Sequence, residues 1–303
     1  MRLGIDIGGT KTAAVVIGAH GDLSEQVRMP TGFGAEEVIE TAVRTVARMA
    51  EIAGAGTSVF SSIGIGIPGA VDSESGRVAH AVNLGLEGLD LGPRLADRLG
   101  VHVRIENDVK AATLGAHHLL GATHSMAYLN LGTGLAAGIV LDGRLLRGGR
   151  GVAGEIGHIP VDPAGEKCGC GQRGCLETLA SGSAIARMWP TSAALPARDL
   201  FDAAEAGDAR AIDVRDRFLT GVAAAARLLA LTTDVDSIVI GGGLAALAES
   251  LLEGTHRILN GWAAESAFLA SLDLAARVQV LPLGFPAAAV GAALVGADQW
   301  QKS

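Results

Sequence analysis

The sequence predicts an α/β protein of two domains, and its length, its composition and an internal repeat support this prediction. The 303 residues are enough for two domains of ordinary size. The hydrophobic fraction is 49%, and the 43 glycines suit layers of strands and helices joined by tight turns. Residues 5–16 and 129–140 share one layout at an offset of 124 residues: an apolar strand, a glycine turn and a second strand. Two glycine-rich hairpins can look alike by chance, but the match favours an internal duplication.

Hydrophobic periodicity predicts the elements of the N-terminal half. The predicted strands are 3–7, 12–17, 23–29, 62–67 and 101–105. The predicted helices are 36–53, 91–99 and one that runs through residues 111–116. Glu106, Asn107 and Asp108 follow the last strand, and we expect Asp108 to cap the helix that comes next. Ligands of open α/β sheets bind at this edge, outside the carboxyl ends of the strands.

The C-terminal half is predicted in the same way. The expected strands are 126–131, 136–141, 237–240 and 278–281, with a hairpin turn at 142–143. The expected helices are 183–188, 198–206, 209–231, 247–259 and 287–297. The long helix over 209–231 consists largely of good helix formers and is interpreted as scaffold.

Charge and hydropathy exclude several classes of protein. The net charge is −8, from 24 basic and 32 acidic residues, and no basic run could neutralise a row of phosphates. No apolar run reaches the roughly 18 residues that span a bilayer. The N-terminus lacks the pattern of a secretory signal. We therefore expect a cytoplasmic protein with neither nucleic acid nor membrane as a partner.

All three cysteines lie in one glycine-rich stretch and predict a metal site. Cys168, Cys170 and Cys175 form a C-x-C-x4-C pattern, and His158 lies ten residues upstream of it. Four such ligands suit a tetrahedral Zn²⁺, and a site closed by four protein ligands is structural rather than catalytic. The alternatives are a disulfide or three unrelated thiols, but an odd count without a secretion signal favours metal.

Polar side chains beside these cysteines predict a binding site for one polar ligand. Glu155 and Glu177 bracket the metal ligands, and zinc would leave one ring nitrogen of His158 available. A metal that holds this stretch would fix all three groups.

Three glycine turns are candidates for contact with phosphates or a nucleotide. Glycine lets backbone N–H groups approach an anion closely, and Thr10, Thr12 and Thr133 add hydroxyl groups at two of the turns. Both turns could equally be tight hairpins without a ligand. The third turn, at 241–243, is compatible with a dinucleotide loop or with a flat shelf for a purine.

Two aspartates are candidates for catalytic roles. Asp108 can act as a general base on a hydroxyl, and Asp6 can hold Mg²⁺ near phosphates. Each also has a purely structural alternative, because Asp108 can serve as a helix cap and Asp6 can stabilise a turn.

These motifs together resemble the ROK family of sugar kinases and repressors. The matching segments are DIGGTKT at 6–12, IPGAVD at 67–72, ENDVKAA at 106–112, LGTGLAAG at 131–138, GEIGHI at 154–159, CGCGQRGCLE at 168–177 and IVIGGGLA at 238–245. The resemblance implies the actin/hexokinase/Hsp70-like ATPase fold, with two duplicated α/β domains and an inter-domain cleft. The implied domains are 1–118 with a C-terminal helix at 292–303, and 119–291, which carries the zinc-binding loop.

The resemblance also implies a role for each candidate residue. Asp108 would be the base on the sugar hydroxyl, and Asp6 would hold Mg²⁺. The implied sugar-binding residues are Gly69, Asn107, Asp108, Glu155, His158 and Glu177. The implied ATP-binding residues are Asp6, Gly8, Gly9, Thr10, Lys11, Thr12, Gly132, Thr133, Gly134, Gly241, Gly242 and Gly243. The implied structural zinc ligands are His158, Cys168, Cys170 and Cys175.

The activity that the resemblance implies is transfer of the ATP γ-phosphate to the 6-hydroxyl of a hexose, glucose first, by a homodimer. An N-acetylhexosamine kinase and a non-catalytic sugar-sensing regulator are the alternatives. Family glucokinases carry an aromatic residue soon after an Asn-Leu pair, whereas this chain has Asn83-Leu84-Gly85-Leu86. The repressor branch carries a helix-turn-helix ahead of the first motif, which we do not expect here because DIGGTKT begins at residue 6.

Overall fold

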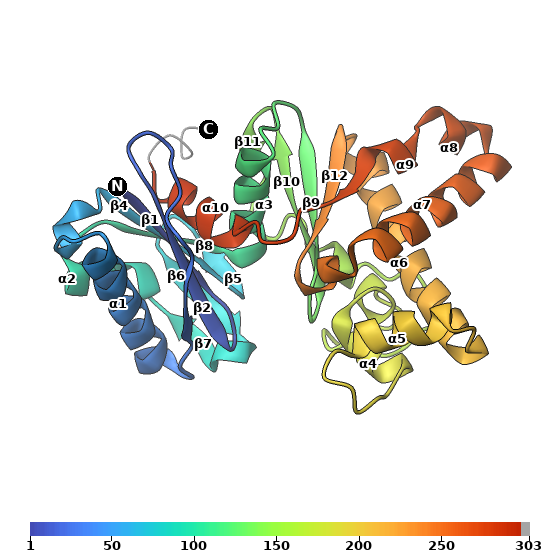
Figure 1. The fold of residues 1–303 in the computed structure, drawn as a ribbon, viewed down its shortest axis with the longest axis horizontal. Helices are drawn as coiled ribbons and strands as arrows, with labels where there is room; N and C mark the ends of the chain where they lie inside the picture. The colour runs from blue at the N-terminus through green and yellow to red at the C-terminus, as the bar shows by residue number, and fades with distance from the viewer. Residues whose placement is uncertain (298–303) are drawn as a thin grey trace. The chain divides into compact units, whose positions relative to one another are not determined.

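The computed structural model describes residues 1–297, which form parts of two compact units (Figure 1). The first unit comprises Met1–Thr123, Gly138–Ala153 and Gly284–Ser303, and the second comprises His124–Ala137 and Gly154–Leu283. The last six residues of the predicted segment 292–303 lie outside the described part of the chain. Each unit is described below by itself.

The first unit is organised around a five-stranded sheet of order β3-β2-β1-β4-β8. Its strands are β1 (Arg2–Ile7), β2 (Lys11–Ile17), β3 (Val27–Pro30), β4 (Ser62–Ile67) and β8 (Val103–Asn107). Strand β1 pairs antiparallel with β2 and parallel with β4, and β4 pairs parallel with β8. The predicted strand 101–105 is observed two residues later, so that β8 ends at Asn107 and places Asp108 at the first position of a helix.

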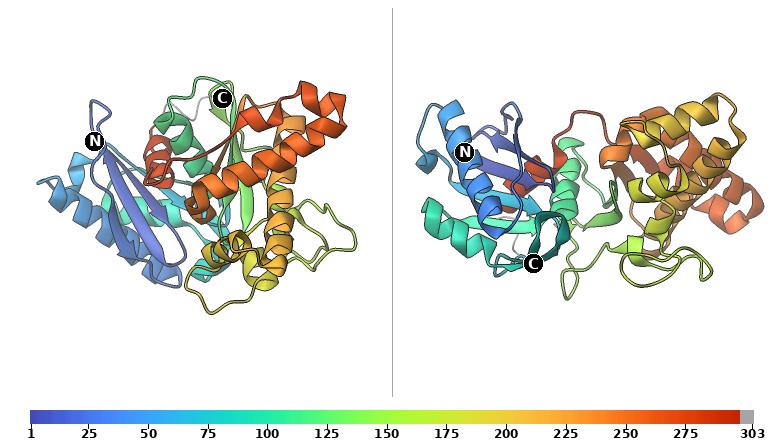
Figure 2. Two further views of the ribbon diagram at one scale, coloured as in Figure 1. Left: turned by 45° about the vertical axis from the view of Figure 1, so that its right-hand side comes forward. Right: turned by 90° about the horizontal axis from the view of Figure 1, so that it is seen from below.

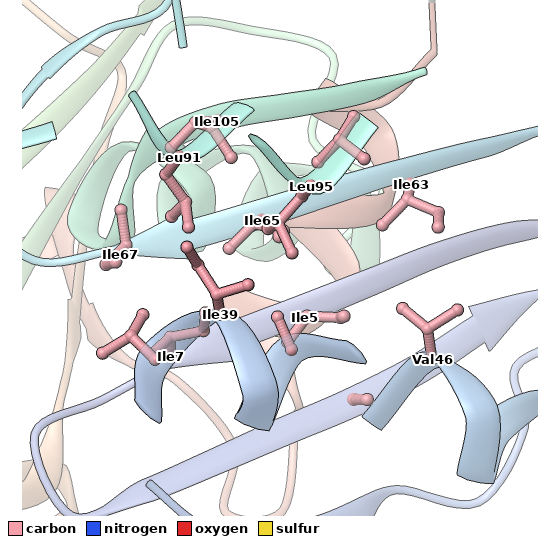
Figure 3. Packing of buried hydrophobic residues seen from close by; sticks show 14 of the residues in the cluster. Ile5, Ile7, Ile39, Val46, Ile63, Ile65, Ile67, Leu91, Leu95 and Ile105 are labelled. Carbon is pink, nitrogen blue, oxygen red and sulfur yellow. The ribbon is translucent and has the colours of Figure 1, made fainter. Parts of the chain in front are cut away.

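One face of this sheet is covered by α1 (Ala35–Ile52) and α2 (Leu91–Leu99), which agree closely with the predicted helices. The isoleucines of the strands point at these helices, as Figure 3 shows for Ile5 and Ile65 opposite Ile39. All three side chains are fully buried. Burying such a side chain stabilises the fold by about 1.5–3 kcal/mol, so this cluster is the main core of the unit.

The opposite face is covered by α3 (Asp108–Leu119) and α10 (Ala287–Val295), which pack against each other although they are far apart in sequence (Figure 2). Helix α10 lies directly on β1 and β4 because the strands present glycine there. A Cβ added to Gly64 would lie 1.8 Å from the carbonyl oxygen of Ala292. A Cβ added to Gly291 would lie 1.6 Å from that of Ala111. The small residues of the helix predicted at 287–297 thus permit contact between backbones.

A second, antiparallel sheet of three short strands was not predicted. It consists of β5 (Ala70–Asp72), β6 (Arg77–Ala81) and β7 (Leu86–Leu89) and lies between β4 and α2 in sequence. These strands are three to five residues long, and the single-turn helix η2 (Val82–Leu84) interrupts them, so no long alternating pattern marks them.

The second five-stranded sheet has the order β11-β10-β9-β12-β13. Its strands are β9 (Met126–Leu131), β10 (Leu135–Leu141), β11 (Arg144–Leu145), β12 (Ser237–Gly241) and β13 (Val278–Val280). As in the first sheet, the first strand in sequence is central, its hairpin partner lies on one side, and later strands pair parallel on the other side. This shared topology confirms the predicted duplication.

The second unit contains most of the remaining helices. They are α4 (Gly182–Met188), α5 (Pro196–Glu205), α6 (Ala209–Thr233), α7 (Ala248–Glu265), α8 (Ala267–Ser271) and α9 (Leu274–Arg277). The predicted helices 183–188, 198–206, 209–231 and 247–259 are confirmed as α4 to α7, whereas α8 and α9 were not predicted. Within residues 1–297, no helix combines the length and the apolar character that crossing a membrane requires.

Candidate active site

Asp6 and Asp108 lie close together on one face of the first sheet. In β1, Asp6 points to the same face as Gly4 and pairs with Gly66 of β4. A Cβ added to Gly66 would lie 3.6 Å from the Cα of Asp108 and 3.8 Å from Oδ1 of Asp6. The pairing of β1 with β4 and the lack of a side chain at Gly66 therefore bring Asp6 and Asp108 close together.

This proximity changes the acid–base behaviour of Asp6. Burial raises the pKa of Asp6 to about 7, and the negative charge of Asp108 contributes to the same rise. A buried carboxyl group next to a second carboxylate is costly to ionise without a cation. Magnesium binds through one or two carboxylates together with the phosphates of a substrate, so this pair fits the ion.

Asn107, rather than Asp108, caps α3, which corrects our prediction. Its Oδ1 accepts the N–H groups of Val109 at 3.0 Å and Lys110 at 3.2 Å. Its Nδ2 donates to the carbonyl oxygen of Gly69 at 3.2 Å and so connects the helix start to the loop before β5. Gly69 has φ +104, and a Cβ there would lie 2.6 Å from the carbonyl oxygen of Ala79, so no other residue fits. The structure thus brings Gly69, Asn107 and Asp108 together.

The turn between β1 and β2 is tight and exposed. The N–H of Gly8 donates to the carbonyl oxygen of Lys11 at 3.0 Å, and Gly9, Thr10 and Lys11 are exposed. Thr12 differs, because its side chain is fully buried and its hydroxyl lies 2.8 Å from that of Thr31. Residues 8–11 can therefore meet an anion, whereas the Thr12 hydroxyl stabilises the sheet.

In the second unit, Glu177 is fixed against the turn between β9 and β10. Its Oε2 accepts the N–H of Leu135 at 2.9 Å. A Cβ on Gly134 would lie 2.4 Å from the same oxygen, so a side chain at this position would displace the Glu177 carboxylate. The carbonyl oxygens of Gly132 and Thr133 accept N–H groups from the start of α4. The second predicted phosphate turn is thereby held in one conformation.

Glu155 belongs to a loop that lies directly on β10. A Cβ on Gly154, which has φ +95, would lie 1.9 Å from the carbonyl oxygen of Ala137. A Cβ on Gly157 would lie 2.0 Å from that of Leu135. These two glycines permit the close approach. The side chain of Glu155 is exposed, and His158, the last residue of the single-turn helix η3 (Ile156–His158), is half-buried.

His158, Cys168, Cys170 and Cys175 form one cluster, as the sequence predicted. Their ligand atoms all lie within 4.8 Å of one another. Nδ1 of His158 lies 3.7 Å from Sγ of Cys168, and the sulfurs of Cys170 and Cys175 are 3.6 Å apart. A tetrahedron with Zn–S bonds of about 2.3 Å has edges of roughly 3.8 Å, whereas a disulfide bond is about 2.05 Å long. The cluster fits a metal ion, and all three cysteines are free thiols.

The protonation of these thiols supports the same interpretation. Hydrogen bonds from the backbone and the side chain of Gln172 lower the pKa of Cys170 to about 6. Burial and then the neighbouring sulfurs, Cys170 first, raise the pKa of Cys175 to about 12. Neighbouring thiolates repel each other, so ionising several of these thiols together costs free energy. A bound divalent cation offsets this repulsion.

The three glycines at the end of β12 differ in the contacts that surround them. A Cβ on Gly241 would lie 2.1 Å from the hydroxyl of Tyr128, which accepts the N–H of Gly242 at 3.1 Å. Gly242 has φ +83, and its Cβ would lie 2.5 Å from the carbonyl oxygen of Leu131. A Cβ on Gly243 would have no heavy atom of the described residues within 4 Å, apart from its chain neighbours. Packing therefore explains the first two glycines, and only the third is open to a ligand.

Sequence reasoning missed three charged residues beside Asp108. Glu106 and Lys110 are almost completely buried, with 2% and 3% of their surface exposed. Oε2 of Glu106 accepts Nε–H of Arg147 at 2.7 Å, and Nζ of Lys110 donates to the carbonyl oxygen of Gly151 at 2.8 Å. The available signal was the presence of Glu106 and Lys110 among the apolar residues of a buried strand and helix, where charges are rare unless paired.

Comparison with known proteins places this constellation in a family. The model of the ROK family matches residues 2–297. The chain belongs to the ROK family. A glucokinase of Halalkalibacterium halodurans is 34% identical over 273 residues, 83% of this chain and 82% of the relative. An N-acetylmannosamine kinase of Citrobacter koseri is 35% identical over 268 residues, 85% of this chain and 88% of the relative.

The fold of this ROK protein is likewise that of known members. A ROK family glucokinase from Streptomyces griseus, solved in complex with glucose and AMPPNP, superposes with a TM-score of 0.78 at 30% identity. The superposition covers 97% of this chain and 98% of that one. The predicted actin/hexokinase-like ATPase fold is thereby confirmed.

Proposed function

We propose that this ROK protein is an ATP-dependent sugar kinase that transfers the γ-phosphate of ATP to the 6-hydroxyl of a hexose, with glucose as the first candidate. The observation that carries the proposal is the pair of neighbouring carboxylates, Asp6 and Asp108, at the carboxyl ends of β1 and β8. It occurs in a chain that is 34% identical to a glucokinase.

In the proposed reaction, Asp108 accepts the proton of the sugar hydroxyl as its oxygen attacks the γ-phosphorus. The bond between that phosphorus and the β,γ-bridging oxygen breaks, and ADP leaves. Phosphoryl transfer depends mostly on positioning and charge neutralisation, and Asp108 supplies the proton acceptor. Asp6 would hold Mg²⁺, which when bound neutralises charge on the phosphates.

Candidate sugar-binding residues are found in both units. In the first unit, Asn107 and Gly69 would bind sugar hydroxyls beside Asp108. In the second, the carboxylates of Glu155 and Glu177 would accept hydroxyl protons, and Nε2 of His158 would be available because Nδ1 faces the sulfur of Cys168. Since Glu177 already accepts the N–H of Leu135, its carboxylate has a fixed orientation for this contact.

Zinc is proposed as a structural ion held by His158, Cys168, Cys170 and Cys175. When bound, it supplies no chemistry to the transfer and holds the loop that carries the sugar-binding side chains. The distances of 3.6 and 3.7 Å between ligand atoms support this assignment.

For ATP, we propose backbone contacts from two turns and an adenosine contact. The turn of Gly8, Gly9, Thr10 and Lys11 would bind phosphates in the first unit, and that of Gly132, Thr133 and Gly134 would do so in the second. Thr12 would shape its turn through the bond to Thr31. Among Gly241, Gly242 and Gly243, the last would lie against adenosine because a side chain there would meet open space.

An N-acetylhexosamine is the second candidate substrate. The relative in Citrobacter koseri is an N-acetylmannosamine kinase of almost the same identity. In addition, Gly85 stands close after the Asn-Leu pair, and a Cβ there would lie 2.6 Å from the ring of Phe33. An aromatic side chain at Gly85 would therefore displace Phe33, and this loop differs from that of the family glucokinases.

A coupled assay of ADP release tests the proposal against its alternatives. The purified chain is supplied with Mg²⁺-ATP and glucose, mannose, fructose, N-acetylglucosamine or N-acetylmannosamine. Turnover confined to N-acetyl sugars favours the second candidate. Binding of a sugar by calorimetry without any turnover identifies a sugar-sensing regulator and rejects the kinase.

Three further predictions concern the whole chain. We expect a homodimer, a cytoplasmic location, and domains at 1–118 with 292–303 and at 119–291. Light scattering after size-exclusion chromatography measures the first, and limited proteolysis with mass spectrometry locates the domain boundaries.

A further inference from the structure

A short segment is held at both of its ends by the residues that flank Asn107 and Asp108. It comprises Arg147, Gly148, Gly149, Arg150 and Gly151 and is called the 147–151 segment below. It follows β11 and leads within four residues to Glu155. The two contacts that hold it, from Glu106 and from Lys110, both lie within the first unit.

The first holding contact is a buried ion pair. Glu106 is 2% exposed, and its Oε2 accepts Nε–H of Arg147 at 2.7 Å. Its other oxygen accepts the N–H of Asn107 at 3.0 Å. One carboxylate therefore connects the start of the segment to the residue that caps α3. A carboxylate so deeply buried needs such partners, because an unpaired one would be strongly destabilising.

The second holding contact comes from a buried lysine. Lys110 is 3% exposed, and its ammonium group donates to the carbonyl oxygen of Gly151 at 2.8 Å. Removing an ammonium group from water is expensive, and a neutral donor would hold a carbonyl oxygen at a lower cost. This contact therefore satisfies one donor of a buried cation and connects the end of the segment to α3.

Gly151 also lies close to β5, the strand that follows Gly69. With φ +73, its added Cβ would lie 3.3 Å from the carbonyl oxygen of Val71, two residues after Gly69. Gly69 in turn accepts the hydrogen bond from Asn107. The end of the segment therefore lies between the start of α3 and β5. In this unit it is close to Asn107 and to Gly69, which are both proposed to bind the sugar.

The segment has little stiffness of its own. Three of its five residues are glycine, and Gly148 and Gly151 both have positive φ. One backbone hydrogen bond closes it, from the N–H of Ala153 to the carbonyl oxygen of Arg147 at 3.2 Å. Glycine-rich chain samples many conformations unless contacts restrict it. The contacts of Glu106 and Lys110 provide this restriction.

We propose that Lys110 and the Glu106–Arg147 pair are positioning residues that hold the 147–151 segment as a wall of the sugar site. The inference rests on the proposed kinase function. Loss of a holding contact would loosen the wall, raise KM for the sugar by about tenfold to a hundredfold, and leave KM for ATP within about twofold.

The test combines hydrogen exchange with kinetics in the full-length protein. Lys110→Met keeps the length of the side chain and removes the donor, and Arg144→Met removes an exposed cation of β11 as a matched control. We expect Lys110→Met, and not the control, to exchange the amides of residues 147–153 faster and to raise KM for the sugar selectively. Unchanged exchange would show that Lys110 does not hold the segment. Faster exchange with an unchanged KM for the sugar would reject the positioning role.

The ion pair provides a second series in case Lys110→Met does not fold. Arg147→Met combined with Glu106→Gln removes the pair without leaving a buried charge, and Arg147→Lys should restore most of the sugar affinity. The proposal would be contradicted if the double variant and Arg147→Lys had the same KM for the sugar. If the wild-type chain turns over no sugar, the proposed kinase function is wrong and the sugar part of this inference falls with it. The exchange comparison then still decides whether the segment is held.

Discussion

Removing the charge of Asp6 should stabilise the protein at alkaline pH while it abolishes turnover. The pKa of Asp6 rises from 3.8 to about 7 on folding. Between these values the folded protein binds one more proton than the unfolded chain. The contribution of Asp6 to the free energy of unfolding is therefore most favourable at low pH and falls as pH rises to about 7. The full shift of about three units corresponds to at most about 4 kcal/mol at 1.36 kcal/mol per unit.

The assay compares urea unfolding of the wild type and Asp6→Asn in magnesium-free buffer at pH 5 and pH 8. About two of the three units lie between these conditions, so the stability difference between the two proteins should widen by roughly 3 kcal/mol in favour of Asp6→Asn. All other titrating groups are shared and largely cancel. Asp97→Asn, which removes an exposed carboxylate of α2, is the matched control.

This account would be refuted if the stability difference between the wild type and Asp6→Asn changed by less than about 1 kcal/mol from pH 5 to pH 8. Such a result would mean that Asp6 is ionised in the folded protein at little cost. Added Mg²⁺-ATP provides a second comparison. If Asp6 holds the metal ion, ligand should stabilise the wild type more than Asp6→Asn, and more strongly at pH 8 than at pH 5.

The remaining predictions test the base, the metal and the glycines. Asp108→Asn should lower kcat by about a hundredfold or more while calorimetry still detects sugar binding; a near-normal rate would remove Asp108 from its role. Elemental analysis should find one zinc per chain in the wild type and none in Cys170→Ser, whose KM for sugar should rise. Gly242→Ala should destabilise the fold by about 2 kcal/mol or more in thermal unfolding, because of its positive φ and its contact with Leu131. Gly243→Ala should leave stability within about 0.5 kcal/mol of wild type and raise KM for ATP, and equal stabilities of the two variants would contradict the distinction.

The sequence predicted most long elements well, because their apolar spacing is strong. Helix 91–99 matched α2 at both ends, and the strand 62–67 matched β4. Short elements were missed. The sheet β5-β6-β7 has strands of three to five residues, and such lengths carry too few alternations to be recognised.

The cap of α3 shows how a small error of register changes a residue's role. We placed the end of the strand at 105, which made Asp108 the cap. Pairing with β4 instead continues β8 to Asn107, whose side chain accepts two N–H groups of the helix. Pairing between strands is a tertiary contact, so the local pattern at this boundary could not reveal it.

The sequence by itself determined the duplicated α/β core, the composition of the metal cluster and the candidate carboxylates, because these depend on residue type and spacing along the chain. Only the tertiary structure decided that Asp6 meets Asp108 across Gly66, and that Nδ1 of His158 faces the cysteines. It also decided that Glu106 and Lys110 hold the 147–151 segment. These contacts join residues up to 102 positions apart in the numbering, as for Asp6 and Asp108, and strand pairing and burial bring such residues together independently of local sequence.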